Sequence, residues 1–239
     1  MNELLLILSI PLIFGALFLG FVLFKKDGLY LWTVLGTISA NIEVLMLVHA
    51  FGMDMTLGNV LFASTFLVTD ILSEIYGKEE SRKAVMVGFF ASLCFMVISQ
   101  TWMFYRPAAS DFATPAIHTI FSNTPRLILS SMAVYVICQY FDVWFFHKIW
   151  DWTNKRDGGQ TERFLWLRNN GSTLTSQLIN TVLYNIFAFA GVYDTKTVVS
   201  IIISCYVIFL VTSLADTPFI YLARSYARKH GVGKYAATV

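Results

Sequence analysis

The 239-residue sequence has few charged side chains, because Asp, Glu, Lys and Arg together make up only 13% of it. Soluble globular domains carry about 25%, so this chain cannot cover a water-facing surface, and a water-soluble enzyme is excluded. A disordered chain is excluded as well, since 56% of the residues are apolar and 16% are aromatic. The net charge of +2 is too small to indicate a nucleic-acid partner.

Cysteine is also scarce. Cys94, Cys138 and Cys205 lie far apart inside apolar stretches, and no Cys-x-x-Cys spacing occurs. This pattern excludes a disulfide framework and indicates no metal site. We expect the three thiols to act as small packing residues, and the sequence predicts no metal or other cofactor.

What the sequence has instead is a series of long apolar runs. Each is long enough to cross the bilayer core as a helix, and the lack of two-residue alternation argues against barrel strands. Only Asn2 and Glu3 precede the first run, so we interpret it as a retained helix and not as a signal peptide. The sequence predicts a single domain, residues 1–239, that is an all-α integral membrane protein with a bundle of about seven transmembrane helices. The predicted spans are residues 4–24, 29–50, 58–77, 84–105, 126–150, 172–192 and 198–223.

Basic residues predict the orientation of this bundle. With seven crossings, 14 of the 17 Lys and Arg residues fall on one side of the membrane and 3 on the other. Because basic loops stay in the cytoplasm, we expect the N-terminus outside and the C-terminus, with a tail over 224–239, in the cytoplasm. If the polar span 58–77 did not cross, the later loops would change sides and the bias would disappear.

Several predicted spans contain polar side chains that a bilayer tolerates poorly. An Asp at the centre of a helix costs about 2.5–3.5 kcal/mol on insertion scales, so such groups must face one another or water and indicate a functional site by default. The alternative for the neutral groups is ordinary hydrogen bonding between helices, and Glu74 and Arg168 could simply pair with each other. The intramembrane polar residues are Asn41, Glu43, Asp70, Glu74, Ser131, Gln139, Asp142, Gln177, Asn180 and Asp216.

The spacing of these groups indicates a polar solute. Asp70 and Glu74 share one helical face, and the pattern Gln-x-x-Asp/Asn occurs twice, at 139–142 and 177–180, in helices that would run in opposite directions, as in inverted-repeat transporters. Carboxylates and carboxamides can make paired hydrogen bonds to a guanine-like base, on which aromatic side chains can stack. A cationic amine would suit the same acids, so the residues alone leave the solute open.

Longer motifs resemble a known family. They are Thr69-Asp70-Ile-Leu-Ser-Glu74-Ile-Tyr76-Gly77-Lys78 with Arg82-Lys83-Ala84, Trp166-Leu-Arg168-Asn169 with Ser172-Thr173 and Ser176-Gln177, the Gln139-x-x-Asp142 pair, and Asp216-Thr217-Pro218. This set resembles the queuosine-precursor transporter family, also called the vitamin uptake transporter family. The resemblance implies a multi-pass protein of the bacterial inner (plasma) membrane. It further implies import of the 7-deazaguanine bases 7-cyano-7-deazaguanine (preQ0) and 7-aminomethyl-7-deazaguanine (preQ1), which feed queuosine synthesis in tRNA.

Together, the polar pattern and the resemblance lead us to expect alternating access around a central cavity lined by the second, third, fifth, sixth and seventh spans. Asp70 and Glu74 would bind the edge of the base, and Arg168 and Asn169 would form a cytoplasmic gate or helix cap. At position 180 the family pattern leads us to expect Asp, whereas this chain has Asn, which cannot take up a proton. The expected substrate-binding residues are Asn41, Asp70, Glu74, Gln139, Asp142, Arg168, Asn169, Ser172, Thr173, Gln177, Asn180 and Asp216.

Two other functions stay open as alternatives. The chain could be the substrate-binding membrane subunit of an ATP-driven vitamin or nucleobase uptake system, with the ATPase on another chain, because no Gly-x-x-x-x-Gly-Lys-Ser/Thr loop occurs here. It could also be an intramembrane enzyme, although His-Glu-x-x-His and Gly-x-Ser-x-Gly are both missing. We expect a transporter that is not an enzyme, with the lipid bilayer and a small molecule as its partners, and the sequence leaves a homo-oligomer open.

Overall fold

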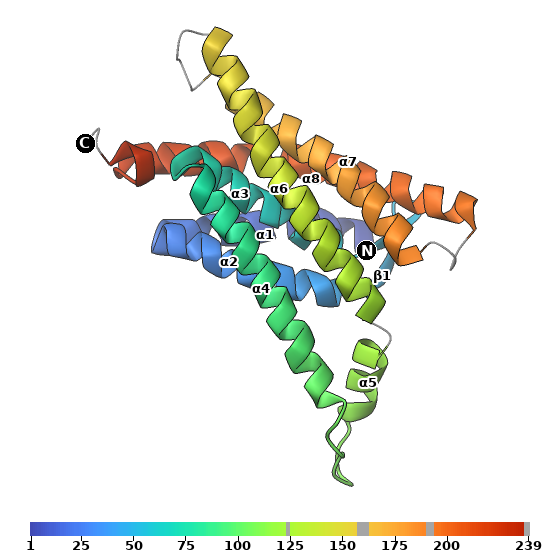
Figure 1. Ribbon diagram of the computed structural model, residues 1–239. Helices are drawn as coiled ribbons and strands as arrows, with labels where there is room; N and C mark the ends of the chain where they lie inside the picture. Colours follow the sequence, from blue (N-terminus) through green and yellow to red (C-terminus); the bar gives the residue numbers. More distant parts are fainter. Residues whose placement is uncertain (123–124, 157–162, 190–193, 237–239) are drawn as a thin grey trace.

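The computed structural model describes residues 1–122, 125–156, 163–189 and 194–236, which form a helical bundle with a short β-hairpin (Figure 1). The elements are α1 (Asn2–Phe24), α2 (Lys26–Glu43), β1 (Leu47–Ala50), β2 (Met53–Thr56), α3 (Gly58–Ile75), α4 (Lys78–Trp102), α5 (Thr114–Ser122), α6 (Pro125–Arg156), α7 (Leu165–Phe189), α8 (Thr195–Lys229) and the 3₁₀ helix η1 (Gly233–Tyr235).

Helix α3 is the centre of the bundle. Nearly all of its residues are buried, and it packs against α1, α2, α4, α6 and α8. The outer helices instead expose large apolar side chains, such as Leu12 on α1 and Phe90 on α4. A helix that carries Asp70 and Glu74 is therefore shielded on all sides by other helices, while leucine and phenylalanine take the positions that would face lipid.

Five helices of the described chain are long and apolar enough to cross a membrane: α1, α3, α4, most of α6, and α8. Helices α2 and α7 have 18 and 25 residues but are not among these five. These features agree with the predicted all-α membrane protein. The count of seven crossings and the placement of the termini stay predictions.

Each predicted span overlaps a helix, but the predicted ends of the second span at residue 50 and of the fourth at residue 105 are wrong, since α4 ends at Trp102, and residues 190–192 of the sixth span lie outside the described residues. Helix α2 ends at Glu43, and residues 47–50 form β1, which pairs antiparallel with β2 in the register Leu47↔Thr56 and Ala50↔Met53. Phe51 and Gly52 connect the strands with positive φ angles of 52° and 74°, the conformation of a tight two-residue hairpin turn. The apolar composition of this segment concealed the hairpin from a hydropathy argument.

The other differences concern helix ends. Helix α5, between α4 and α6, was not expected, and α7 begins at Leu165 instead of 172. Helix α8 continues to Lys229, past the predicted end at 223. Polar residues carry these helices beyond the apolar runs, because a helix need not stop where the hydrocarbon layer stops.

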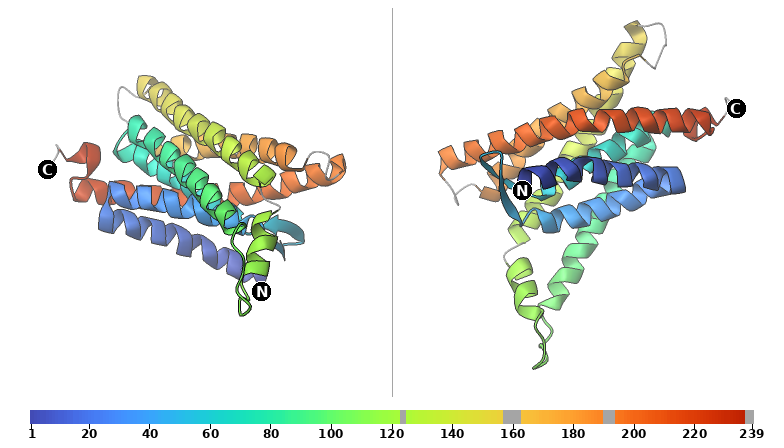
Figure 2. Two further views of the ribbon diagram at one scale, coloured as in Figure 1. Left: turned by 60° about the horizontal axis from the view of Figure 1, so that its bottom comes forward. Right: turned by 180° about the vertical axis from the view of Figure 1, so that it is seen from behind.

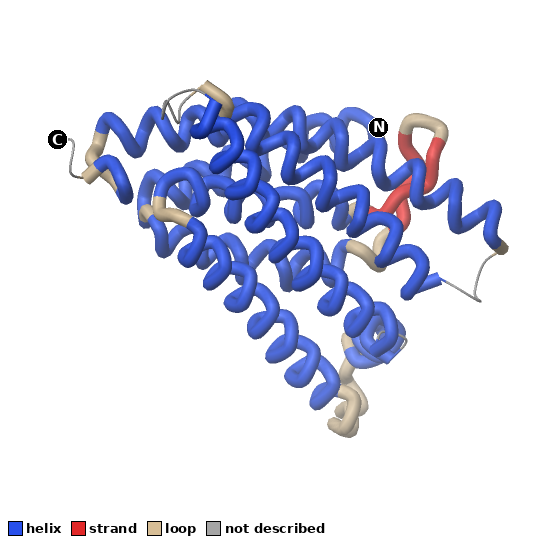
Figure 3. The backbone as a smooth tube through the Cα atoms, turned by 45° about the horizontal axis from the view of Figure 1, so that its top comes forward, coloured by secondary structure: helices blue, strands red, loops and turns tan. Residues whose placement is uncertain are grey.

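The two ends of the bundle are built differently. The N-terminus and the hairpin lie at one end, and the C-terminus with η1 lies at the other (Figures 1 and 3). Helices α1, α2 and α8 pack against one another or against α3 along one side (Figure 2), while the far end of α4 projects from the bundle with α5 beside it. The site described next lies at the hairpin end.

Candidate functional site

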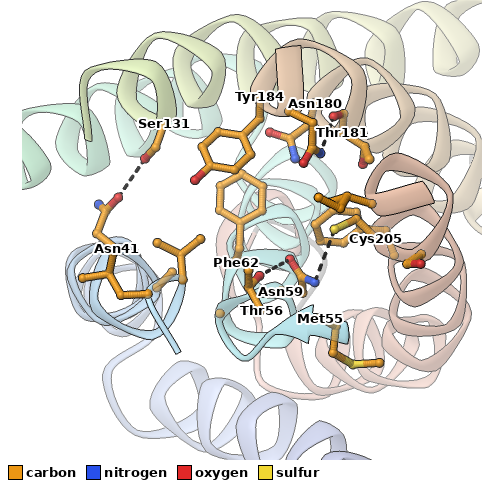
Figure 4. Close-up of a pocket in the computed structure, with 18 of the residues that line it drawn as sticks. Asn41, Met55, Thr56, Asn59, Phe62, Ser131, Asn180, Thr181, Tyr184 and Cys205 are labelled. Carbon is orange, nitrogen blue, oxygen red and sulfur yellow. Dashed lines mark hydrogen bonds between the residues drawn. The ribbon is translucent and has the colours of Figure 1, made fainter. Parts of the chain in front are cut away.

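A cavity of about 670 Å³ lies at the hairpin end of the bundle. Small-molecule sites typically have volumes of about 300–1,000 Å³. Its walls come from α2, α3, α6, α7 and α8, which are the five elements predicted to line the cavity, together with Ser92 of α4 and residues of the hairpin. Figure 4 shows the labelled residues arranged around this space: Asn41, Met55, Thr56, Asn59, Phe62, Ser131, Asn180, Thr181, Tyr184 and Cys205.

Carboxamide side chains from three helices present hydrogen-bonding groups at the cavity wall. Asn41 of α2 accepts a hydrogen bond from the Ser131 hydroxyl of α6 at 2.7 Å. Asn59 of α3 accepts one from Thr56 at 3.1 Å, and Asn180 of α7 also lines the space (Figure 4). A carboxamide offers both donors and acceptors, so this wall can match the mixed edge of a polar heterocycle.

Aromatic rings close the cavity on the side of the bundle interior. Phe62 lies between the labelled polar groups in Figure 4, and its ring packs against Phe66, Tyr135 and Phe209 at centroid distances of 5.5, 6.3 and 6.2 Å. Phe66 is fully buried, one turn deeper along α3. These rings separate the cavity from the polar side chains beneath it and provide flat surfaces on which a planar base can stack.

Beneath the rings lies a layer of three buried aspartates, Asp70 of α3, Asp142 of α6 and Asp216 of α8. Thr173 donates to Asp70 at 3.1 Å, and Ser176 donates to Asp142 at 2.9 Å. The remaining oxygens, Oδ1 of Asp70 and Oδ2 of Asp142, have no hydrogen-bond partner among the described residues. The layer therefore keeps unused hydrogen-bonding capacity away from water.

Carboxamides of α6 and α7 continue this layer. Asn169 donates to Asp216 at 2.7 Å, and Gln139 bridges Thr65 and Thr69 of α3 at 2.7 and 3.1 Å. Gln177 is fully buried, and its two amide atoms have no partner in the described part of the chain. Gln139 thus fastens α6 to α3, whereas Gln177 is available to an additional ligand.

A fourth buried acid, Glu74, lies near the other end of α3 among charged groups. It pairs with Arg168 of α7 at 2.8 Å and with Lys234 of η1 at 3.2 Å, and Arg224 of α8 lies 4.0 Å away. The guanidinium of Arg168 stacks over Trp150, 4.3 Å from the ring centroid. Glu74 is therefore neutralised where it lies, and the pairing considered as the alternative for Glu74 and Arg168 is present.

The predicted site residues are thus divided between levels. Asn41 and Asn180 line the cavity; Asp70, Gln139, Asp142, Thr173, Gln177 and Asp216, with Ser172 and Asn169 on α7, lie buried below it; and Glu74 with Arg168 forms the ion cluster. Sequence reasoning missed the cavity residues Asn59, Phe62 and Thr181. Asn59 is polar and lies in the predicted third span, which could have indicated it, but Phe62 resembles any other core aromatic.

The composition of the site suits an organic solute better than a metal. No group of three or more His, Cys, Asp or Glu side chains in the described residues could hold a metal ion. Hydroxyl, carboxamide and carboxylate groups face one another with aromatic rings above them.

The comparisons with known proteins identify the family. The family described as "Putative vitamin uptake transporter" matches residues 56–223, well over half of the chain. The chain belongs to the vitamin uptake transporter family. It is therefore a membrane protein of a transporter family, and a transporter acts on a small-molecule substrate. Membership of this family disfavours the enzyme alternative. The matched region contains the aspartate layer, the Glu74 ion cluster except Arg224 and Lys234, and most of the cavity wall.

Two relatives of this transporter carry more specific names. It is 38% identical over 201 residues to the "Probable queuosine precursor transporter" of Bacillus subtilis (strain 168), covering 84% of this chain and 85% of that protein. It is 27% identical over 112 residues to the protein of the same name from Haemophilus influenzae, covering 47% of this chain and 46% of that protein. No solved structure matches significantly.

Proposed function

We propose that this transporter imports the queuosine precursors 7-cyano-7-deazaguanine, 7-aminomethyl-7-deazaguanine, or both, across the bacterial inner membrane. The 38% identity to a protein named for queuosine precursors supports the substrate class. The observation that carries the proposal is the cavity of about 670 Å³, whose wall helices α3, α6 and α7 carry, further along, buried carboxyl and carboxamide groups that have no partner among the described residues. A membrane protein that only needed to pack its helices would not retain these groups.

The proposed orientation places the cavity at the outer surface. With seven crossings and the N-terminus outside, the hairpin, the start of α3 and the start of α8 are all external. The cationic residues Arg168, Arg224 and Lys234 then lie toward the cytoplasm around Glu74. The described arrangement is the outward-facing state of an alternating-access cycle, with the ion cluster as its cytoplasmic closure.

The chemistry of a deazaguanine suits both levels of the site. Its flat ring would stack on Phe62 and Tyr184, while Asn41, Asn59 and Asn180 would contact its polar edge. The ring N–H and the amino group are adjacent donors, so free oxygens such as Oδ1 of Asp70 can accept them when the base moves inward. The other predicted residues of the buried layer would bind the remaining edge, and Arg168 and Asn169 would act in the gate.

The decisive experiment uses cells that cannot synthesise the precursor but can convert it. Expressing the transporter and supplying each base separately should restore queuosine in tRNA, with the base that works defining the substrate. If neither base restores the modification, the proposed substrate is wrong. Uptake of the base by the purified chain in liposomes without ATP distinguishes a self-sufficient carrier from a subunit that depends on an ATPase.

The same assay tests the buried layer. Asp70→Ala should abolish uptake, because it removes the acceptor oxygens of the layer, while insertion into the membrane persists. Asp151→Ala is the matched control, since Asp151 lies on the exposed face of α6. A well-expressed Asp70→Ala variant that takes up the base at the normal rate would refute the role of Asp70.

A further inference from the structure

Three carboxyl groups face one another in the interior of the bundle, one each from α3, α6 and α8. Asp70, Asp142 and Asp216 are all 1% exposed or less. The three carboxyls lie close enough together for the charge of Asp142 to act on both Asp70 and Asp216. Ionised carboxylates are acceptors only. These carboxyls can therefore hydrogen-bond to one another only when one of them carries a proton.

The unpartnered atoms around these carboxyls are also acceptors. Besides Oδ1 of Asp70 and Oδ2 of Asp142, the carbonyl Oδ1 of Asn169 has no hydrogen-bond donor among the described residues. Asn169 is fully buried and its other amide atom is bound to Asp216, so its carbonyl belongs to the same cluster. Buried acceptors that face other acceptors lack donors, and a bound proton supplies one.

The cationic side chains nearest to these aspartates along α3 are bound to another acid, Glu74. Arg168, Lys234 and Arg224 converge on Glu74, one turn beyond Asp70 on α3. The groups presented to the aspartates by α7 are the neutral Thr173 and Ser176 beside Asn169, and α4 contributes the hydroxyl of Ser81, which donates to the Thr69 carbonyl. On α6 the further titratable group is the thiol of Cys138, which interacts with Asp142.

Physical chemistry limits the charge that this cluster can hold. A buried carboxylate without a cation is strongly disfavoured, and neighbouring buried carboxyls hold a proton between them instead of all ionising together. At least one carboxyl is therefore neutral in the outward-facing state. Opening to the cytoplasm would change the surroundings of the cluster and allow the proton to leave.

We propose that the Asp70–Asp142–Asp216 cluster is a proton-binding site that couples import of the base to entry of a proton. The proton binds a carboxylate of the cluster when the cavity faces outward, stays there during the change of state, and passes to water on the cytoplasmic side. The path from the cavity to the aspartates is short. Asn180 lines the cavity, and Ser176, which donates to Asp142, is four residues away on α7, about 6 Å along the helix axis. The coupling rests on the proposed import of deazaguanines.

The test uses purified full-length protein in liposomes that enclose a pH-sensitive dye. Translocation without a proton gradient is measured as exchange of labelled for unlabelled base across the membrane. This exchange is measured separately for 7-cyano-7-deazaguanine and for 7-aminomethyl-7-deazaguanine. Adding the exchanged base outside should acidify the interior, and an exterior one pH unit more acidic should raise accumulation about tenfold for one proton per base. A protonophore should abolish this accumulation.

Infrared difference spectra of the same protein locate the proton without any substrate. The wild type should show the carbonyl stretch of a protonated carboxylic acid at neutral pH, and Asp142→Asn should lose or shift it, whereas the exposed control Asp151→Asn should not. In liposomes, the ratio of gradient-driven uptake to exchange should fall to that of uncoupled transport for Asp142→Asn and Asp216→Asn.

The outcomes separate the two proposals. Exchange of a base without acidification overturns the coupling and leaves the import function standing. Absence of exchange for both bases overturns the import function, and the infrared spectra then decide whether the cluster holds a proton. A wild-type spectrum without a protonated carboxyl, or one that none of the Asp→Asn substitutions changes, overturns the proton site.

Discussion

Asp70 and Glu74 lie one turn apart on the same face of α3, and both are buried, yet their surroundings differ. Glu74 is paired with Arg168 and Lys234. Both of these cations also lie over the aromatic ring of Trp150. Asp70 accepts from one hydroxyl, that of Thr173, and its Oδ1 has no partner within the described part of the chain. The difference indicates that Glu74 holds the bundle together, whereas Asp70 is free to exchange partners. Burial of an acid alone therefore does not identify a functional group.

The largest expected effect comes from breaking the compensated acid. Glu74→Gln should lower the free energy of unfolding by about 3–5 kcal/mol, because it removes the carboxylate that pairs at 2.8 Å with the buried guanidinium of Arg168. Thermal unfolding in detergent should show a Tm lower by about 6–20 °C. The control is Glu79→Gln in the exposed pair with Arg82, which should change stability by less than about 0.5 kcal/mol. Equal effects of both substitutions would mean that the buried ion cluster contributes no more to the free energy of unfolding than an exposed ion pair.

The matched change at the uncompensated acid should reverse the balance between stability and transport. Asp70→Asn keeps the shape and the acceptor for Thr173, and it removes a buried charge. Stability should change by about 1 kcal/mol at most, but uptake should fall at least tenfold, about 1.4 kcal/mol. Uptake and Tm measured on the same preparation check both parts. A large loss of stability with normal uptake would remove the distinction between the two acids.

A smaller effect is expected for the outermost partner of Glu74. The Lys234 side chain is 35% exposed, so water replaces part of its interaction, and Lys234→Ala should cost about 1 kcal/mol or less. The Tm of Lys234→Ala should lie between those of wild type and Glu74→Gln. A loss as large as that of Glu74→Gln would show that η1, and not Arg168, provides most of the neutralisation.

The smallest change in stability is expected at the cavity wall. Asn180 lines the cavity and is 7% exposed, so the charge of Asn180→Asp keeps access to the cavity space and should lower the Tm by about 2 °C or less. We expect it to alter the preference between the 7-cyano and the cationic 7-aminomethyl base by a few-fold in favour of the cation. Competition between the two bases for uptake measures this ratio. An unchanged ratio would indicate that position 180 does not contact the substituent.

Hydropathy and charge patterning predicted the helices well, because lipid imposes the same requirement on every span. They failed at residues 47–56, where an apolar segment forms a hairpin whose turn depends on the positive φ angles of Phe51 and Gly52. Helical spacing placed Asp70 and Glu74 on one face, but it could not reveal which of them meets a cation. Arg168 lies 94 residues and Lys234 lies 160 residues from Glu74, and that proximity comes only from the tertiary fold.

The position of the cavity could not be predicted from the sequence for a related reason. Twelve residues were predicted to bind substrate, and two of them, Asn41 and Asn180, line the cavity. Polarity shows which residues avoid lipid, but it does not show whether they meet water or one another. Gln139 and Gln177 illustrate this point, because they have the same chemistry and burial, but Gln139 is fully engaged with α3 and Gln177 has no partner among the described residues.

The attachment of η1 to Glu74 has a consequence for biosynthesis. Glu74 leaves the ribosome long before Arg168 and Lys234, which follow it by 94 and 160 residues. During synthesis, α3 must therefore remain at the insertion machinery or in contact with water. Its Glu74 has no cationic partner until α7 and then η1 are made. Final assembly is thus a late event, and premature termination near residue 230 would leave an inserted protein whose central helix lacks its last cation.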